Sequence, residues 1–87
     1  MAEYRVLIKT SAAKELEAVG AKADRQRIIG RIRSLGANPR PLGSEKLAGY
    51  GDRYRVRQGR YRIIYLVDDQ SQDVTIFKVG HRRDVYR

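Results

Sequence analysis

The sequence predicts an α+β fold in which a helical hairpin packs on one face of a mainly antiparallel, four-stranded sheet, in the order β-α-α-β-β-β. Three observations predict it: an alternating stretch near the N-terminus, two segments of helical periodicity after it, and three β-rich segments separated by turns. At 87 residues, the chain is expected to form a single domain, residues 1–87, whose core holds one sheet and a few helices.

The first strand is predicted over residues 3–9, where apolar side chains largely alternate with polar ones. Thr10 and Ser11 follow this strand and offer hydroxyl groups for the N-cap of a helix. A short helix is predicted over residues 12–19, where apolar residues recur at helical spacing, and Gly20 is expected to end it.

A second helix is predicted over residues 22–35, where isoleucine and leucine recur every three or four positions. Gly36 is expected to end it, because the Asn-Pro-Arg-Pro sequence at 38–41 makes continuation improbable. The short spacer around Gly20 predicts that the two helices form an antiparallel pair. The remaining faces of the second helix carry arginines that we expect to be solvated: Arg25, Arg27, Arg31 and Arg33.

A strongly basic hairpin is predicted after a glycine-rich loop over residues 42–52. Its first strand reads Arg-Tyr-Arg-Val-Arg, so alternation points Arg53, Arg55 and Arg57 to one face and the intervening tyrosine and valine to the other. The arginines are therefore predicted to share one face of the sheet.

The rest of the sheet follows from turn residues and β-branched runs. A turn is predicted at Gly59, since glycine accepts positive φ without steric cost. Residues 60–67 are rich in aromatic and β-branched residues and predict a well-buried strand. After a polar turn over 68–73, a last strand is predicted over 74–79 and is expected to end at Gly80.

The basic hairpin carries the strongest functional signal. Folding brings Arg55 and Arg57 near Arg62 on the neighbouring strand, and like charges that close repel by about a few tenths of a kcal/mol or more. A fold has no need of such a cluster, whereas a surface that binds polyanions does. With 19 basic against 10 acidic residues, most of these arginines cannot be paired internally. The net charge of +9 predicts attraction to nucleic acid, an acidic membrane or an acidic protein.

Several classes of function are disfavoured by composition. The chain has no cysteine, so it has no disulfide, thiolate metal site or cysteine nucleophile, and it fits a reducing cytoplasm. Its apolar runs are far shorter than the ~20 residues of a membrane span. The carboxylates of the polar turn suggest no metal site, because no other ligand converges on them: Asp68, Asp69 and Asp73.

Several local patterns occur together in one order. They are Asn-Pro-x-Pro at 38–41, Tyr-Arg-x-Arg-x-Gly-x-Tyr-Arg at 54–62 and Gly-His-Arg-x-x-x-Tyr at 80–86. In this combination the sequence resembles the toxins of type II toxin–antitoxin pairs in the RelE/ParE superfamily, over nearly the whole chain. The resemblance implies the fold described above, and it implies a cognate antitoxin that neutralises the toxin within a hetero-oligomeric complex.

The superfamily divides by target. RelE-type members are endoribonucleases that cut messenger RNA in the ribosomal A site, whereas ParE-type members inhibit DNA gyrase. The RelE-type site uses basic residues on the middle strands, an arginine after the last strand and a C-terminal tyrosine. All these positions are filled here, which favours the RelE-like branch, with messenger RNA and ribosomal RNA as partners and no cofactor or metal. The matching residues are Arg55, Arg57, Arg62, Arg82 and Tyr86.

The implied reaction is attack of a 2′-hydroxyl on its own phosphate, which requires a proton acceptor, cations around the phosphate and a proton for the departing 5′ oxygen. Arg62 and Arg82 are expected to hold the phosphate, because guanidinium groups bind phosphate oxygens bidentately. Tyr86 is a candidate base and a stacking platform. His81 is either the acid or a structural hydrogen-bonding group. The residues expected to bind RNA are Arg53, Arg60, Lys78, His81 and Arg83.

Two rival functions remain open at this point. A ParE-like gyrase inhibitor on the same fold would not need Tyr86. A basic nucleic-acid-binding module without catalysis would bind in a strongly salt-dependent way and cut nothing.

Overall fold

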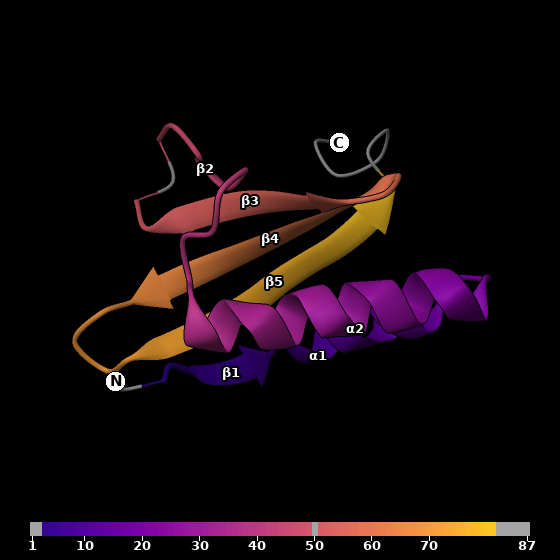
Figure 1. Ribbon diagram of the computed structural model, residues 1–87, viewed down its shortest axis with the longest axis horizontal. Helices are drawn as coiled ribbons and strands as arrows, with labels where there is room; N and C mark the ends of the chain where they lie inside the picture. The colour runs from indigo at the N-terminus through magenta and orange to yellow at the C-terminus, as the bar shows by residue number, and fades with distance from the viewer. Residues whose placement is uncertain (1–2, 50, 82–87) are drawn as a thin grey trace.

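The computed structural model describes residues 3–49 and 51–81, which form two helices and one five-stranded sheet. The order of the strands across the sheet is β1-β5-β4-β3-β2 (Figure 1). The elements are β1 (Arg5–Ile8), α1 (Thr10–Glu17), α2 (Lys22–Ala37), β2 (Glu45–Lys46), β3 (Arg53–Gln58), β4 (Tyr61–Asp68) and β5 (Asp73–His81). β1 pairs with β5 in parallel and every other neighbouring pair is antiparallel, so the predicted α+β fold is confirmed.

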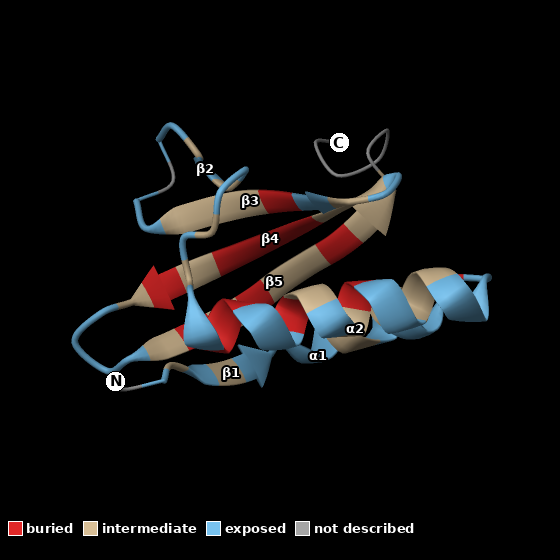
Figure 2. Cartoon of the chain, viewed as in Figure 1, coloured by how far each residue is buried: buried red, intermediate tan, exposed pale blue. Residues whose placement is uncertain are grey.

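Both helices pack against one face of the sheet, and the core lies between the two layers (Figure 1). Ile28, Ile32 and Leu35 of α2 belong to the same buried cluster as Val56 of β3 and Ile63 of β4. Buried positions follow β3, β4 and β5 and the side of α2 that faces them (Figure 2). Burying each such aliphatic side chain contributes about 1.5–3 kcal/mol, which makes this layer the main source of stability. Neither described helix is long and apolar enough to span a membrane.

The prediction that Gly36 ends the second helix is wrong, because α2 continues through Gly36 to Ala37. At Gly36 the helix passes directly over β1. The backbone N–H of Tyr4 donates to the carbonyl of Gly36 at 2.8 Å, and a Cβ at this position would lie 3.0 Å from the carbonyl oxygen of Tyr4 and 3.1 Å from Val6 Cγ2. Glycine is needed here for close approach of two backbones.

Three other predicted boundaries differ from the structure. α1 begins at Thr10 with Lys9 as its N-cap and without a capping side chain, because the Lys9 N–H still bonds to β5 through the carbonyl of Ile76. The predicted loop contains the two-residue strand β2, paired with β3. β5 runs past Gly80 to His81, because the first residues of β4 need partners there. The predicted four-stranded sheet therefore has a fifth, short strand.

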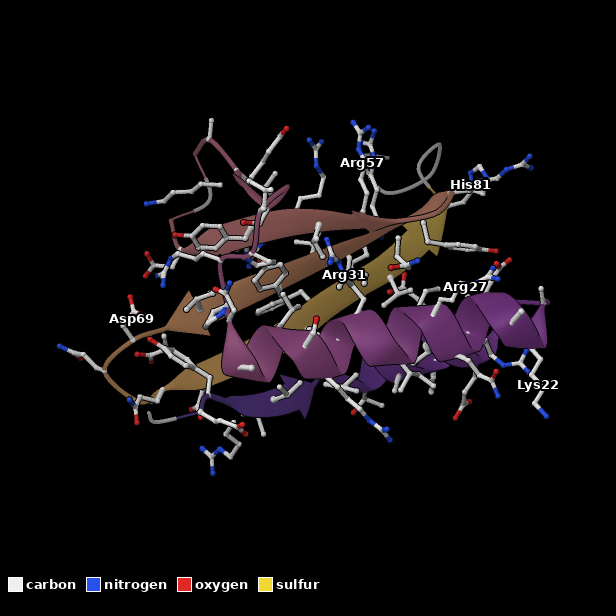
Figure 3. All side chains as sticks on the ribbon, viewed as in Figure 1. Lys22, Arg27, Arg31, Arg57, Asp69 and His81 are labelled. Carbon is white, nitrogen blue, oxygen red and sulfur yellow. The ribbon has the colours of Figure 1, made fainter. Side chains whose placement is uncertain are left out.

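The arginines of α2 are not all solvated as predicted. Arg25 donates to the carbonyl of Val19 at 2.6 Å and so caps the C-terminal end of α1. Arg31 points from α2 toward the sheet (Figure 3), and its Nε is buried without a hydrogen-bond partner among residues 3–49 and 51–81. Arg27 forms an exposed ion pair with Asp24 at 3.7 Å.

A polar latch at the far end of the sheet joins the loop after α2 to the β4–β5 turn. It consists of Arg40, Asp69, Tyr4 and Tyr54. Arg40 donates two hydrogen bonds to Asp69, at 3.1 and 2.8 Å, and its Nε donates to the Tyr54 hydroxyl at 2.9 Å. The Tyr4 hydroxyl donates to Asp69 at 2.6 Å. These bonds tie the loop after α2 to the β4–β5 turn.

The close approach at Gly36 generates a matched pair of substitutions in one helix. Gly36→Ala should lower the free energy of unfolding by about 1–3 kcal/mol, because the new methyl group meets the Tyr4 carbonyl and the Val6 side chain. Gly30→Ala should raise it by about 0.5–1 kcal/mol, since nothing lies within 4 Å of the added Cβ and alanine favours the helix. Urea unfolding of both variants measures the difference. Equal effects of the same sign would contradict the packing described here.

The latch generates a pH-dependent prediction. Hydrogen bonds first from Arg40 and then from Tyr4 hold the pKa of the Asp69 carboxyl below its ordinary value of 3.8. A lowered folded-state pKa means that the carboxylate stabilises the fold above the unfolded-state value, and that this stabilisation is lost as the pH falls through the folded-state value. Asp69→Asn should therefore lower the Tm at pH 7, and this loss should shrink as the pH falls below 3.8.

The control for this measurement is Asp24→Asn, which removes an exposed ion pair of little energetic value. Thermal unfolding followed by circular dichroism at both pH values compares the two variants. A Tm loss for Asp69→Asn that is the same at pH 3 and pH 7 would contradict a role for the ionised carboxylate.

Candidate functional site

The β3–β4 hairpin places the basic residues on the face of the sheet away from the helices. Val56 is fully buried toward the helices, so its neighbours on β3, Arg55 and Arg57, point to the opposite face. Gly59 closes the hairpin with φ of +60°, a conformation that glycine adopts without strain. Arg57 projects away from the helix layer in Figure 3.

Arg57 and Arg62 face each other directly across the hairpin. Side chains in such a pair start from Cβ atoms about 4.5–5.5 Å apart, so the two guanidinium groups share one region of the surface. On the other side of Arg62 the paired residue of β5 is Gly80, which adds no side chain to compete for space. Two guanidinium groups at this separation can donate hydrogen bonds to the non-bridging oxygens of one phosphodiester.

Arg55 is arranged differently, because it forms an ion pair with Glu45 of β2. The Arg55 side chain is 14% exposed, while the Glu45 side chain is 65% exposed. Internal pairing with a carboxylate, rather than a ligand, thus accounts for the orientation of Arg55. The sequence analysis did not identify Glu45 as a site residue, because the two residues of β2 are too few to show a strand periodicity.

Three of the residues predicted to bind RNA, Arg53, Lys78 and Arg60, lie in different environments. The Arg53 guanidinium lies over the ring of Phe77, 4.6 Å from its centroid, so Arg53 is held by a cation–π contact on the open face. Lys78 pairs with Glu15 of α1 at 3.7 Å, which draws it toward the edge of the sheet. Arg60 is exposed in the turn between β3 and β4.

His81 lies apart from the arginine pair. Its ring meets Tyr61 edge-to-face, with centroids 5.8 Å apart, and Tyr61 packs against the core on the helix side. Tyr61 and Arg62 are successive residues of a strand, so their side chains point to opposite faces. This placement favours the structural interpretation of His81 over its interpretation as the catalytic acid.

Three predicted site residues, Arg82, Arg83 and Tyr86, lie outside the described residues. The structure thus brings Arg57 and Arg62 together, adds Arg55 with Glu45 beside them, and holds Arg53 farther along the same face.

Comparison with known proteins agrees with this geometry. Residues 6–86 match the family described as the ParE toxin of type II toxin–antitoxin systems, parDE. The toxin RelG of Mycobacterium tuberculosis (strain ATCC 25618 / H37Rv) is 27% identical over 84 residues, which cover 97% of both chains. The toxin RelE of the same strain is 29% identical over 84 residues, which cover 97% of this chain and 87% of that toxin.

Solved structures extend the comparison to the fold. The chain superposes on an archaeal RelE–RelB complex from Pyrococcus horikoshii OT3 with a TM-score of 0.82 and 33% identity, covering 95% of this chain and 99% of the matched chain. The isolated E. coli RelE toxin gives a TM-score of 0.76 at 28% identity, over 95% of this chain and 90% of that one. The resemblance found in the sequence is thereby confirmed: the chain belongs to the ParE toxin family of type II toxin–antitoxin systems and is a RelE-like toxin.

Proposed function

We propose that this toxin is a ribosome-dependent endoribonuclease that cuts messenger RNA without a metal ion. The observation that carries the proposal is the facing pair of Arg57 and Arg62 on the sheet surface away from the helices. Its family supports the proposal, since RelE and RelG toxins are among its relatives in sequence and RelE is among them in fold. We further propose that the toxin acts in the cytoplasm, where translated messages are found.

The proposed reaction is an internal transesterification. The 2′ oxygen of a ribose bonds to the adjacent phosphorus while the bond from phosphorus to the 5′ oxygen breaks, leaving a 2′,3′-cyclic phosphate and a free 5′-hydroxyl. Arg57 and Arg62 hold the non-bridging oxygens and stabilise the extra negative charge of the phosphorane. Arg82 is proposed to complete this cationic site, and Tyr86 to stack on a base and to give a proton to the departing 5′ oxygen.

We propose that the proton acceptor is Glu45 and not Tyr86, the candidate base of the sequence analysis. Its carboxylate is anchored on Arg55 and remains largely exposed, and Arg55 stands two residues from Arg57 on the same face of β3. A carboxylate can accept a proton at neutral pH, whereas a guanidinium is already fully protonated and cannot. We therefore assign Glu45 as the base for the 2′-hydroxyl and Arg55 as the residue that positions it.

The proposed partner in the resting state is a cognate antitoxin. Relatives of the same fold were crystallised as RelB–RelE complexes. The net charge of +9 favours an acidic partner. Leu7 and Ile8 of β1 are 39% and 44% exposed, so the partner should also carry apolar side chains that cover them. An amphipathic acidic segment meets both requirements.

Gyrase inhibition remains the second candidate, since the family that matches the chain is described by ParE and parDE. In that case the arginines would contact gyrase or its DNA, and no message would be cut.

Removing either member of the facing arginine pair should lower the rate of message cleavage by about 10²-fold, the usual effect of losing one preorganised contact to developing charge. Arg57→Ala and Arg62→Ala test this. The control is Arg33→Ala, which removes one positive charge from an exposed position on α2. Primer extension on a translated message in a purified translation system measures the cuts, and circular dichroism verifies folding.

The rival function is tested in the same preparations by supercoiling assays with purified gyrase. Inhibition of gyrase at toxin concentrations that leave messages intact would overturn the nuclease proposal. Cleavage that is undiminished in both arginine variants would overturn the site while leaving the family assignment standing.

Replacing Glu45 by glutamine separates proton transfer from positioning. The amide still accepts a hydrogen bond from Arg55 but takes no proton, so the cleavage rate should fall by about 10²–10⁴-fold. Single-turnover cleavage of a translated message measures the rate, with Glu17→Gln on α1 as the control. A Glu45→Gln variant that keeps the wild-type rate would restrict Glu45 to an ion-pairing role.

A further inference from the structure

The last residues of β5 extend past the strand that pairs with them on one side. β1 pairs with β5 as far as Ile8, which lies opposite Ile76, and the Lys9 N–H adds a hydrogen bond to the carbonyl of Ile76 at 3.0 Å. Beyond this point the described part of the chain has no strand paired with β5 on the side away from β4. The end of β5 is therefore a sheet edge, and strand ends at an edge open more readily than central strands.

A bulge lies at the start of this segment of β5. The register between β4 and β5 shifts between Ile64 and Tyr65, which leaves Phe77 of β5 without a residue opposite it. A bulge interrupts the ladder of hydrogen bonds and changes the faces to which the following side chains point. After the bulge, Val79 is 2% exposed and belongs to the core between the two layers. The position of the segment after Phe77 thus depends on contacts that this segment makes itself.

Glu15 of α1 makes such a contact. Its Oε1 accepts a hydrogen bond from the Val79 N–H at 3.1 Å, and its Oε2 lies 3.7 Å from Lys78 Nζ. Helical spacing puts Glu15 on the same side of α1 as the buried residues Ala12 and Val19. A carboxylate is a strong acceptor, and this one pairs a backbone N–H that a neighbouring strand would otherwise bind. Glu15 therefore replaces the missing strand at the end of β5.

The strand end that Glu15 holds also supports the arginine pair. The residue after Val79 is Gly80, which lies opposite Arg62. Arg62 in turn faces Arg57 across the hairpin, and the two cations repel each other. The position of Arg62 thus depends on the strands on both of its sides. A displacement of about 1 Å from the reacting geometry can lower a rate by about 10²-fold, so a loosened end of β5 would reach the chemistry.

We propose that Glu15 is a positioning residue for RNA cleavage. Its carboxylate fixes the end of β5, β5 fixes the start of β4, and Arg62 is thereby held where it binds the phosphate that is cut. Glu15 belongs to the helix layer, and the arginine pair belongs to the opposite face of the sheet. It therefore acts through the backbone of β5 and not on the substrate. This inference deepens the proposed nuclease function and rests on it.

Three substitutions of Glu15 separate its hydrogen bond from its charge. Glu15→Gln keeps an oxygen for the Val79 N–H and loses the charge, Glu15→Asp keeps the charge on a side chain one methylene shorter, and Glu15→Ala removes both. Single-turnover cleavage of a translated message measures the rate. Hydrogen exchange followed by nuclear magnetic resonance measures the opening of the Val79 amide in the isolated toxin. The control is Glu17→Ala, at an exposed position of the same helix.

The hydrogen bond, and not the charge, should decide the rate. In Glu15→Ala the Val79 amide should exchange at least ~10-fold faster, because its acceptor is lost, and cleavage should slow by about 10²-fold. Glu15→Gln should keep most of the wild-type rate, since its amide oxygen still accepts the Val79 N–H, and Glu15→Asp should lie between the two. Exchange of the Val67 amide, whose N–H donates to the carbonyl of Asp52 at the other end of β4, should not change, which separates this local effect from a general loss of stability.

The outcomes that overturn the proposal differ from those that overturn the nuclease function. Cleavage rates that do not follow Val79 exchange across the variants would contradict positioning through this hydrogen bond, and so would a Glu15→Gln toxin as slow as Glu15→Ala. If the wild-type toxin cuts messages and Glu15→Ala cuts them equally fast, the positioning role alone fails. A wild-type toxin that cuts no translated message would remove the nuclease function and the positioning role together.

Discussion

The register of the β3–β4 hairpin is the constraint on which the rest of the molecule depends. It sets Val56 opposite Ile63 on the helix side and Arg57 opposite Arg62 on the other. Burying the two aliphatic side chains contributes about 1.5–3 kcal/mol each, whereas two facing cations repel by about a few tenths of a kcal/mol or somewhat more. The core therefore holds the arginines together against their repulsion. A slip of one residue would send all of them into the helix layer.

The parts of the fold that sequence patterns predict are those with their own periodicity. The helical pair, the basic hairpin and the last strand follow from spacing, and the facing of Arg57 and Arg62 follows from the hairpin. The parts that could not be predicted depend on single contacts between distant segments. From the sequence, Gly36 looks like the end of a helix, and only its contact with Tyr4 and Val6 shows why glycine is needed there. Glu45 could not be placed on a face of the sheet, because its strand has only two residues. Glu15 accepts a hydrogen bond from the Val79 N–H of β5. This N–H is available because β1 ends at Ile8 and does not extend alongside Val79.

The distribution of acidic residues explains how a chain with so many arginines keeps some of them available. Asp73, Asp69 and Glu45 form ion pairs with Arg5, Arg40 and Arg55 respectively. Two of these pairs lie near the β4–β5 turn, at the end of the sheet away from the β3–β4 turn, and there they stabilise loops. Within residues 3–49 and 51–81, no carboxylate forms an ion pair with Arg57. Excess positive charge is thereby concentrated at the end of the sheet where RNA is proposed to bind.

The first two residues of β4 belong to opposite faces of the sheet. Arg62 lies on the open face and Tyr61 packs against the core on the helix side, so the strand holds them one residue apart. The burial of Tyr61 thereby helps to fix the face on which Arg62 is presented. Since the register of the hairpin already places Arg57 opposite Arg62, the proposed grip on a phosphate requires no conformational change. That grip depends on one turn of one hairpin, the turn that Gly59 closes with its positive φ.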